Sequence, residues 1–507
     1  MIKNIFLPVL LLFIIGCSTN WGPLQQNLNA PENSAVLNCA ELYVETDQAI
    51  VAAKVVDTQA ARIDGYPYLR VNRFLSSFRN EVAGVAFESW VDRLQELAME
   101  GWNVELLNLP VMDRHRLEEL LGTTHPGSPR LIDVLHTCGN IMRKNDLDNR
   151  VKQDALREKA TVPEEYQTWQ RIAGFYPLTA IAFRLGINRW HKQTLETYRI
   201  PLQKLPVKGL LTRYTPPENS SSLRAAEVAD IIKHSSDNPL SIPDPDPAGQ
   251  RRLFDSFAPA FEIDVASGED KIGVPVWEGD KSPVIDTSKP MVYRQLSYTR
   301  IGKKILLQLN YMIWFPSRPK NSAFDLLGGH LDGIIWRVTL LPDGRPWIFD
   351  SIHACGCYHL FFPTQYTQIS GQQPIFDEPA FMPQQPLKSG DGARTVIRIA
   401  PASHYIERVY FSSAASGHEN HYQWDDENSL RSLPMPDGNR RSLYGQDGIV
   451  AGSERSERFL FWPMGIPSPG AMRQWGHHAT AFVGRRYFDD SRIFENTFDI
   501  FYQKKPP

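Results

Sequence analysis

The chain has 507 residues, of which 42% are hydrophobic and 22% are charged, and its formal net charge at pH 7 is -3. This composition predicts a chain that buries a core, and it excludes an intrinsically disordered protein. The charge balance, without a basic stripe interleaved with aromatic residues, argues against a nucleic acid partner.

Residues 1–16 are predicted to be an export signal, because Lys3 precedes an apolar run, 5–15, that is too short to cross a bilayer as a helix. The run ends in Ile14-Ile15-Gly16-Cys17, which resembles the lipobox of bacterial lipoproteins. The resemblance implies cleavage before Cys17 and its acylation, so that the membrane is a partner through a lipid anchor. Ser18 stands where an Asp often retains lipoproteins in the inner membrane. The resemblance therefore implies the cell envelope, at the outer membrane facing the periplasm or the exterior.

Residues 17–35 are then expected to be the acylated cysteine and a flexible tether, and residues 36–234 a mostly helical domain. A helix that buries Phe87 and Leu94 is expected to stop at Gly101. Another helix follows Pro163, and its aromatic side chains are expected to lie in the core: Tyr166, Trp169 and Tyr176.

Two of the four cysteines that follow Cys17 lie in this helical part. An exported protein folds where disulfides are permitted, but four cysteines allow three pairings. We predict a structural disulfide between Cys39 and Cys138. Two buried thiols are the alternative, since Cys138 falls on the apolar face of a predicted helix.

Residues 235–249 contain four prolines and predict an extended linker, which we take as the main domain boundary. Several short segments rich in β-branched and aromatic residues follow it. Residues 250–507 are therefore expected to form an antiparallel β-rich domain, either a sandwich or a partly closed barrel. The predicted fold class is α+β, with the helical domain first.

A β-hairpin is predicted within the β-rich domain, with its turn at Pro342–Gly344. A three-residue loop closed by Leu341 and Arg345 pairs Arg337 with Phe349 and Gly333 with His353. His330 and Asp332 then become neighbours of His353 and Cys355. Strict alternation puts the two groups on opposite faces of the hairpin, unless one of the nearby glycines permits a bulge.

Three chemistries fit these side chains. His330, His353 and His359, with a cysteine and with His478 as a distant ligand, predict a divalent metal such as Zn²⁺. Cys355 or Cys357 is the candidate nucleophile, and Asp332 is a candidate catalytic or ligating group. The stretch "SIHACGC" resembles the Ser/Thr-His-Gly-Cys motif of L,D-transpeptidases, but Ala354 replaces its glycine, so we do not carry that activity over. The third chemistry is a strained disulfide between Cys355 and Cys357.

A structural role for these residues stays open, because histidines at strand ends often bond the backbone and buried cysteines behave as apolar groups. The chain lacks GxGxxG after a strand, a P-loop and GxSxG, which argues against a dinucleotide enzyme, an NTPase and an α/β-hydrolase. We therefore expect a lipid-anchored envelope protein that binds a divalent metal and acts as a hydrolase. The alternatives are a non-enzymatic scaffold or assembly factor with envelope protein partners, and a Cys/His acyl-transfer enzyme of the cell wall.

Overall fold

The computed structural model describes residues 22–29, 33–120, 129–217, 222–279, 282–320, 322, 324–370, 377–388, 393–413, 419–495 and 497–500. The predicted signal, 1–16, and the predicted acylation site, Cys17, lie outside these residues. Within them no helix has the length and apolar character that crossing a bilayer requires.

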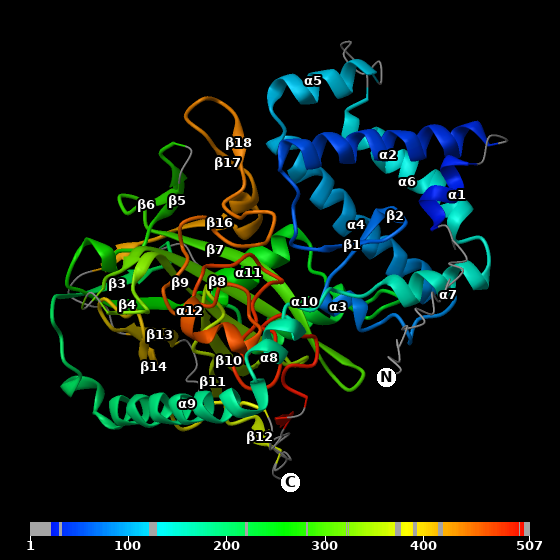
Figure 1. Ribbon diagram of the computed structural model, residues 1–507. Helices are drawn as coiled ribbons and strands as arrows, with labels where there is room; N and C mark the ends of the chain where they lie inside the picture. The colour runs from blue at the N-terminus through cyan, green and yellow to red at the C-terminus, as the bar shows by residue number, and fades with distance from the viewer. Residues whose placement is uncertain are drawn as a thin grey trace, which may run out of the picture.

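The helical lobe, as we call the first part of the fold, is built on three long helices that pack around one hairpin (Figure 1). They are α2 (Ser34–Ala53), α4 (Val85–Asn108) and α6 (Leu131–Asp146), around β1 (Ala61–Ile63) and β2 (Tyr66–Val71). Smaller helices complete the lobe: α1 (Pro23–Leu28), α3 (Arg73–Ser76), α5 (Val111–Leu120) and α7 (Arg150–Lys159).

Apolar side chains at helical spacing build the core of the helical lobe. Trp90, Leu94 and Ala98 of α4 are fully buried, as the periodicity predicts. A disulfide joins Cys39 of α2 to Cys138 of α6, between residues 99 positions apart. The folded chain begins earlier than residue 36, because α1 lies in the predicted tether and its Asn27 donates a hydrogen bond to Asp146.

The sheet lobe, the second part, contains a six-stranded sheet in the order β11-β10-β9-β8-β7-β16. Its strands are β7 (Met291–Ile301), β8 (Lys304–Arg318), β9 (Gly329–Leu340), β10 (Pro346–His353), β11 (Leu360–Pro363) and β16 (Gln423–Asp426). A five-stranded sheet in the order β14-β13-β4-β3-β15 shares a core with it. Its strands are β3 (Leu210–Thr215), β4 (Ala260–Val265), β13 (Arg394–Ile399), β14 (Ile406–Ser412) and β15 (Glu419–His421).

Helices cover the sheet lobe: α8 (Thr168–Ala173), α9 (Tyr176–Arg199), α10 (Ala225–Ser235), α11 (Pro247–Phe257) and α12 (Arg458–Phe461). The short strands are β5 (Val274–Trp277), β6 (Pro283–Asp286), β12 (Thr367–Ile369), β17 (Leu433–Pro434), β18 (Arg440–Arg441) and β19 (Phe498–Ile500). The 3-10 turns are η1 (Leu202–Lys204), η2 (Gly268–Asp270), η3 (Glu427–Arg431) and η4 (Trp462–Met464).

The α+β class predicted from the sequence is confirmed, with the long helices of the N-terminal part followed by sheets that are mostly antiparallel. Three pairs are parallel: β4 with β13, β3 with β15, and β7 with β16. Residues 36–234 contribute to both lobes, because β3 pairs with β4 in the five-stranded sheet. Within the predicted linker 235–249, Leu240 and Ile242 pack on the core of the helical lobe.

A buried ionic network joins the two lobes at Asp57, which follows α2. Its carboxylate accepts hydrogen bonds from Arg431 at 2.7 and 3.0 Å and from Gln474 at 2.9 Å, both of which belong to the sheet lobe. Arg70 of the helical lobe lies 3.5 Å from the same carboxylate and bonds Glu105 at 2.7 Å. Because these charges are shielded from water, the network fixes one lobe against the other.

Candidate functional site

The predicted hairpin is present, and its turn has the expected form. The amide of Leu341 donates to the carbonyl of Arg345 at 2.8 Å, and Gly344 has a φ of +82°, which favours glycine. The ladder between β9 and β10 departs from the predicted register. Arg337 pairs with Asp350 rather than Phe349, and Ile334, rather than Gly333, pairs with His353.

A β-bulge causes this one-residue shift, because the register changes between Pro346 and Ile348. The shift has a chemical consequence. Side chains of paired residues lie on one face, so His353 shares the face of Ile334 and therefore of Asp332. The bulge thus brings together two polar groups that the unbroken ladder would have separated.

Asp332 is the centre of a buried network. Its Oδ1 lies 3.3 Å from Nδ1 of His353, and its Oδ2 lies 2.9 Å from Nδ1 of His404. Nε2 of His404 lies 3.5 Å from Oδ1 of Asp270, a residue of η2. Each of these four side chains is at most 6% exposed. The structure thus places two imidazoles on one carboxylate, and His404 comes from the loop between β13 and β14.

The charges in this network follow from its geometry. Burial lowers the pKa of His404, but Asp270 and Asp332 raise it more, so its pKa lies above the ordinary value. Burial raises the pKa of Asp332, but His353 and His404 bring it well below its usual range. Burial also lowers the pKa of His353, which favours a neutral ring. These shifts favour an ion pair between Asp332 and His404, and the hydrogen bond with Asp332 orients the ring of His353.

Backbone strain concentrates around the same network. Positive φ values occur at Leu331 (55°), Tyr358 (59°), Ala402 (60°) and His404 (54°), none of which is glycine. Tyr358 packs its ring against His353 at 5.0 Å between centroids, and the amide of Ala402 donates to Asp270. Each such conformation costs about 1–3 kcal/mol, so the surrounding contacts must hold all four residues in place.

The other predicted ligands point to different partners. His330 bonds the carbonyl of Pro283 at 2.6 Å through Nε2. His359 bonds Asp350 at 2.9 Å, and burial lowers its pKa to about 3. His478 packs beside Phe488, and burial lowers its pKa to about 3.

Within the part of the chain that the structure describes, no three His, Cys, Asp or Glu side chains are grouped as metal ligands. Of the predicted site residues, Asp332 and His353 share a side-chain hydrogen bond. The metal site stays a prediction.

Cys355 and Cys357 lie in the tight turn that follows β10, and both are free thiols. The amide of Cys357 donates to Sγ of Cys355 at 3.4 Å, and Gly356 takes a φ of +88° between them. A separate hydrogen bond between the two thiol groups, together with burial, raises the pKa of the Cys357 thiol well above its ordinary value. Because the thiolate is the reactive form, this environment does not activate Cys357 as a nucleophile.

We therefore expect iodoacetamide at pH 7.5 to alkylate Cys355 and Cys357 about tenfold or more slowly in the folded protein than in the unfolded chain. Mass spectrometry after alkylation, with and without urea, measures the difference at each cysteine. Cys357→Ser should remove one labelled site and leave Cys355 protected. Rapid labelling of native Cys357 would instead support the nucleophile hypothesis, and two unreactive sulfurs in urea would indicate a Cys355–Cys357 disulfide.

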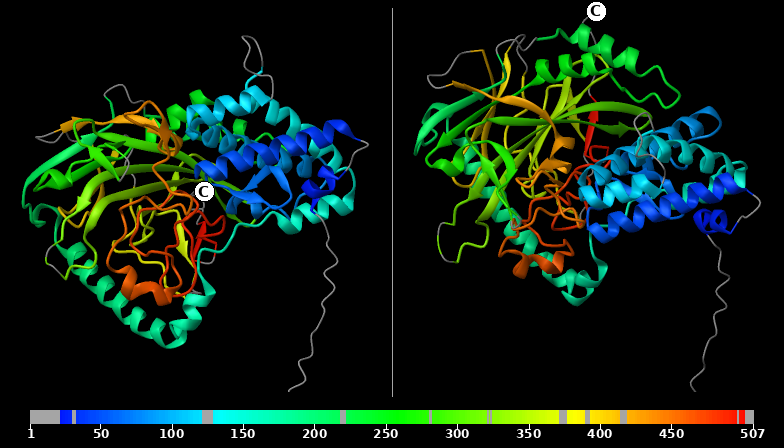
Figure 2. Two further views of the ribbon diagram at one scale, coloured as in Figure 1. Left: turned by 45° about the horizontal axis from the view of Figure 1, so that its top comes forward. Right: turned by 90° about the horizontal axis from the view of Figure 1, so that it is seen from above.

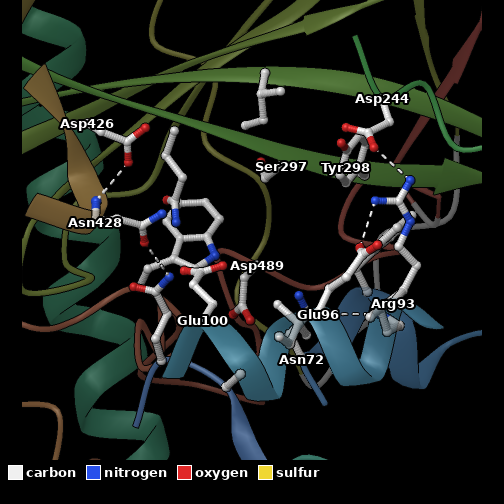
Figure 3. A pocket seen from close by; sticks show the side chains of 18 of the residues that line it. Asn72, Arg93, Glu96, Glu100, Asp244, Ser297, Tyr298, Asp426, Asn428 and Asp489 are labelled. Carbon is white, nitrogen blue, oxygen red and sulfur yellow. Dashed lines mark hydrogen bonds and ion pairs between the residues drawn. The ribbon is translucent and has the colours of Figure 1, made fainter. Parts of the chain in front are cut away.

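A second candidate site is a cavity of about 350 Å³ between the two lobes, which we call the interlobe cavity (Figure 3). Helix α4 supplies one wall and β7 another, while η3 and the residue before it close a third side. The volume lies in the range of about 300–1,000 Å³ that small-ligand sites occupy, and such sites are frequent between domains. The polar side chains of its wall include Glu96, Glu100, Asp244, Gln295, Asn428 and Asp489.

Several charged side chains along the interlobe cavity have partners in the protein. Arg93 bonds Glu96 at 3.0 Å and Asp244 at 2.6 Å, as Figure 3 shows. Glu100 pairs with Arg431 of the network that joins the lobes. Each of these arginines holds two carboxylates, because Arg431 also pairs with Asp57. The wall therefore has many hydrogen-bonding atoms, and its acidic residues outnumber its arginines.

Asp489 and Asp426 also have partners. Asp489 bonds Arg73 at 3.0 Å, and Asp426 accepts a hydrogen bond from the backbone amide of Asn428 at 2.9 Å. Aromatic side chains lie between the polar groups, among them Phe74, Tyr298 and Trp475. The cavity therefore offers flat apolar surfaces beside donors and acceptors.

Sequence reasoning missed His404, Asp270 and the interlobe cavity. His404 is a single histidine in "PASHYIE", with no spacing signal, and Asp270 is one acidic residue of a polar loop. The cavity wall comes from many separate segments, which no local pattern connects. Comparison of the chain with protein families, with curated proteins and with solved structures finds no match.

Proposed function

We propose that the protein binds a neutral, hydroxyl-rich ligand of the oligosaccharide class in the interlobe cavity. The observation that carries the proposal is a polar wall on which arginines and carboxylates are already paired with one another. A strongly charged ligand would have to compete with existing ion pairs, such as those of Arg93. Hydroxyl groups can instead donate to carboxylates and accept from guanidinium groups without breaking the pairs.

The aromatic residues of the cavity support the same ligand class. Tyr298 packs on Phe74 with ring centroids 4.9 Å apart, which holds its ring in one orientation. Trp475 adds a second ring on the wall and is 8% exposed. Small-ligand sites combine such apolar surfaces with a few placed polar groups, and sugar rings present both kinds of surface.

The predicted anchor is consistent with this ligand. We propose that Cys17 is acylated, which would hold the protein at the membrane in a compartment where the cell wall supplies oligosaccharide strands. Ligand binding in the interlobe cavity requires neither the predicted metal ion nor a nucleophilic cysteine. It is compatible with a binding or scaffold protein of the envelope.

Calorimetric titration with a tetramer of N-acetylglucosamine and with cellotetraose tests the proposal. We expect saturable binding of at least one of them. Gln295→Trp, which places a large side chain in the cavity, should weaken this binding by about tenfold or more because it occupies the ligand's volume.

The matched control is Gln423→Trp. Gln423 is exposed on β16, outside the cavity lining, so its replacement should leave the affinity unchanged. Absence of binding to both tetramers, or binding that persists in Gln295→Trp, would contradict the proposal.

A further inference from the structure

A set of large apolar side chains on α8, α9, α12 and η4 is exposed, with exposed fractions of 36% to 72%. We call this set the apolar face. Single exposed apolar residues are ordinary, but a contiguous group on one side of a protein marks an interaction surface. The principal members are Trp169, Ile172, Leu178, Ile181, Phe459 and Trp462.

The segments that carry the apolar face pack on one another. The amide of Gln167, next to α8, donates to the carbonyl of Gly465, after η4, at 2.7 Å. Phe183 of α9 contacts Phe461 of α12 with ring centroids 5.3 Å apart. Figures 1 and 2 show α8, α9 and α12 together at the edge of the sheet lobe. The segments that carry the exposed side chains are therefore neighbours on the sheet lobe.

Helix α9 has apolar residues on two sides, although one apolar stripe is sufficient for packing. Its inner side is used, since Phe183 packs on Phe461 and Trp190 packs on Phe381. Its outer side carries Leu178 and Ile181 at 70% and 61% exposure. Burial within this chain therefore does not explain the outer residues.

We propose that the apolar face lies in the headgroup layer of a lipid bilayer. The inference rests in part on the proposed acylation of Cys17. Five peptide steps separate Cys17 from Gly22, the first described residue, and these span at most about 18 Å. Gly22 lies beside the side chain of Lys159. Nine peptide steps connect Lys159 to Thr168 at the start of α8, and they span at most about 32 Å. An anchored protein can therefore reach the same bilayer with α8 and α9.

The composition of the surface fits a lipid interface. Trp169 and Trp462 belong to the residue type that concentrates at the boundary between headgroups and acyl chains. Beyond Leu185 the outer side of α9 becomes basic, with exposed Arg189 and Lys192. Apolar residues next to basic ones suit a helix that lies in the plane of an anionic membrane surface.

The test uses the chain from Ser18 onward, which lacks the acylation site, and vesicles of phosphatidylethanolamine and phosphatidylglycerol. We expect the protein to float with the vesicles in a density gradient. Leu178→Glu combined with Ile181→Glu should reduce the bound fraction by about tenfold or more, since two charges enter the apolar layer. Val151→Glu on α7 is the matched control, because Val151 is 80% exposed and lies away from the apolar face.

Because the substituted residues are exposed, the melting temperature of each variant should equal that of the parent chain, and this measurement verifies folding. Failure of the parent chain to bind vesicles, or equal binding by the double variant, would overturn the proposal. So would a dimer in sedimentation that only the double variant abolishes, together with an absence of vesicle binding. None of these outcomes bears on acylation of Cys17 or on oligosaccharide binding, which are measured separately.

Discussion

Asp57→Ala is expected to lower the free energy of unfolding by about 3–5 kcal/mol, because it removes a buried carboxylate that two buried cations share. The side chains of Arg70 and Arg431 are 1% and 2% exposed, so water cannot take the place of the lost carboxylate. Arg70 keeps Glu105, but Arg431 loses two hydrogen bonds. The loss should be visible in both lobes, since the network lies between them.

Urea unfolding followed by circular dichroism measures this change, with Asp133→Ala as the control. Asp133 also bonds an arginine, Arg130, at 2.9 Å, but both side chains are at least 49% exposed. Exposed ion pairs contribute about 0–1 kcal/mol, so the control should unfold almost as the parent protein does. A similar small effect for both variants would show that the network of Asp57 is hydrated.

The same carboxylate should make stability depend on pH. Burial raises the pKa of Asp57, but Arg431 and Arg70 lower it more, so the folded pKa lies below the ordinary value. A carboxylate with a depressed pKa stabilises the fold above its unfolded pKa of about 3.9, and this contribution is lost as pH falls through the folded pKa. The difference in stability between the parent protein and Asp57→Asn should therefore shrink in acid.

His404→Ala is expected to destabilise the sheet lobe by about 3–5 kcal/mol, since it removes the cation between two buried carboxylates. Asp270 and Asp332 both lie within 3.5 Å of the imidazole. The ring also stacks on Phe315, with centroids 3.9 Å apart and planes 3° apart, so packing is lost as well.

Thermal and urea unfolding of three variants separate these contributions. His404→Asn keeps a polar side chain and tolerates the positive φ, so it should lose less stability than His404→Ala. Exposed His234→Ala is the control and should change the free energy of unfolding by less than about 0.5 kcal/mol. A mild effect of His404→Ala would show that water or a repacked side chain compensates the two carboxylates.

The spacing of apolar residues predicted the long helices but not where each of them ends. Gly101 was expected to end a helix, yet α4 continues to Asn108. A Cβ at Gly101 would lie 2.1 Å from Nη1 of Arg70, so this glycine makes room for a buried guanidinium. A glycine that permits a close approach and a glycine that ends a helix look the same in a sequence.

The aromatic stripe after Pro163 was predicted to lie in the core, and for Trp169 this is wrong. Trp169 is 64% exposed, and the helix is interrupted at Gly174 and Phe175, between α8 and α9. Tyr166 is buried as expected. Spacing identifies which residues share a face, but it does not reveal what covers that face.

At the candidate site the turn chemistry of Pro342–Gly344 was sufficient to predict a hairpin, and the neighbourhood of Asp332 and His353 followed from it. The bulge after Pro346 was not predicted, although this proline has no N–H to donate to the ladder and prolines in sheets are found at strand starts and bulges. His404 lies in the loop between β13 and β14, 72 residues after Asp332 in the sequence. Long-range contacts of this kind depend on how the two sheets pack, which a single sequence does not encode locally.

The interlobe cavity has walls at positions as distant as Gln59 and Asp489. Asp57 likewise meets Gln474 across 417 positions of the chain. A ribosome or a translocation pore delivers the N-terminus first, so the helices emerge long before the residues that complete this wall. The interlobe cavity can therefore form only after the C-terminal residues of its wall have been synthesised. Early termination near residue 470 would remove Trp475 and Asp489, and with them one side of the interlobe cavity, while sparing the Cys39–Cys138 disulfide.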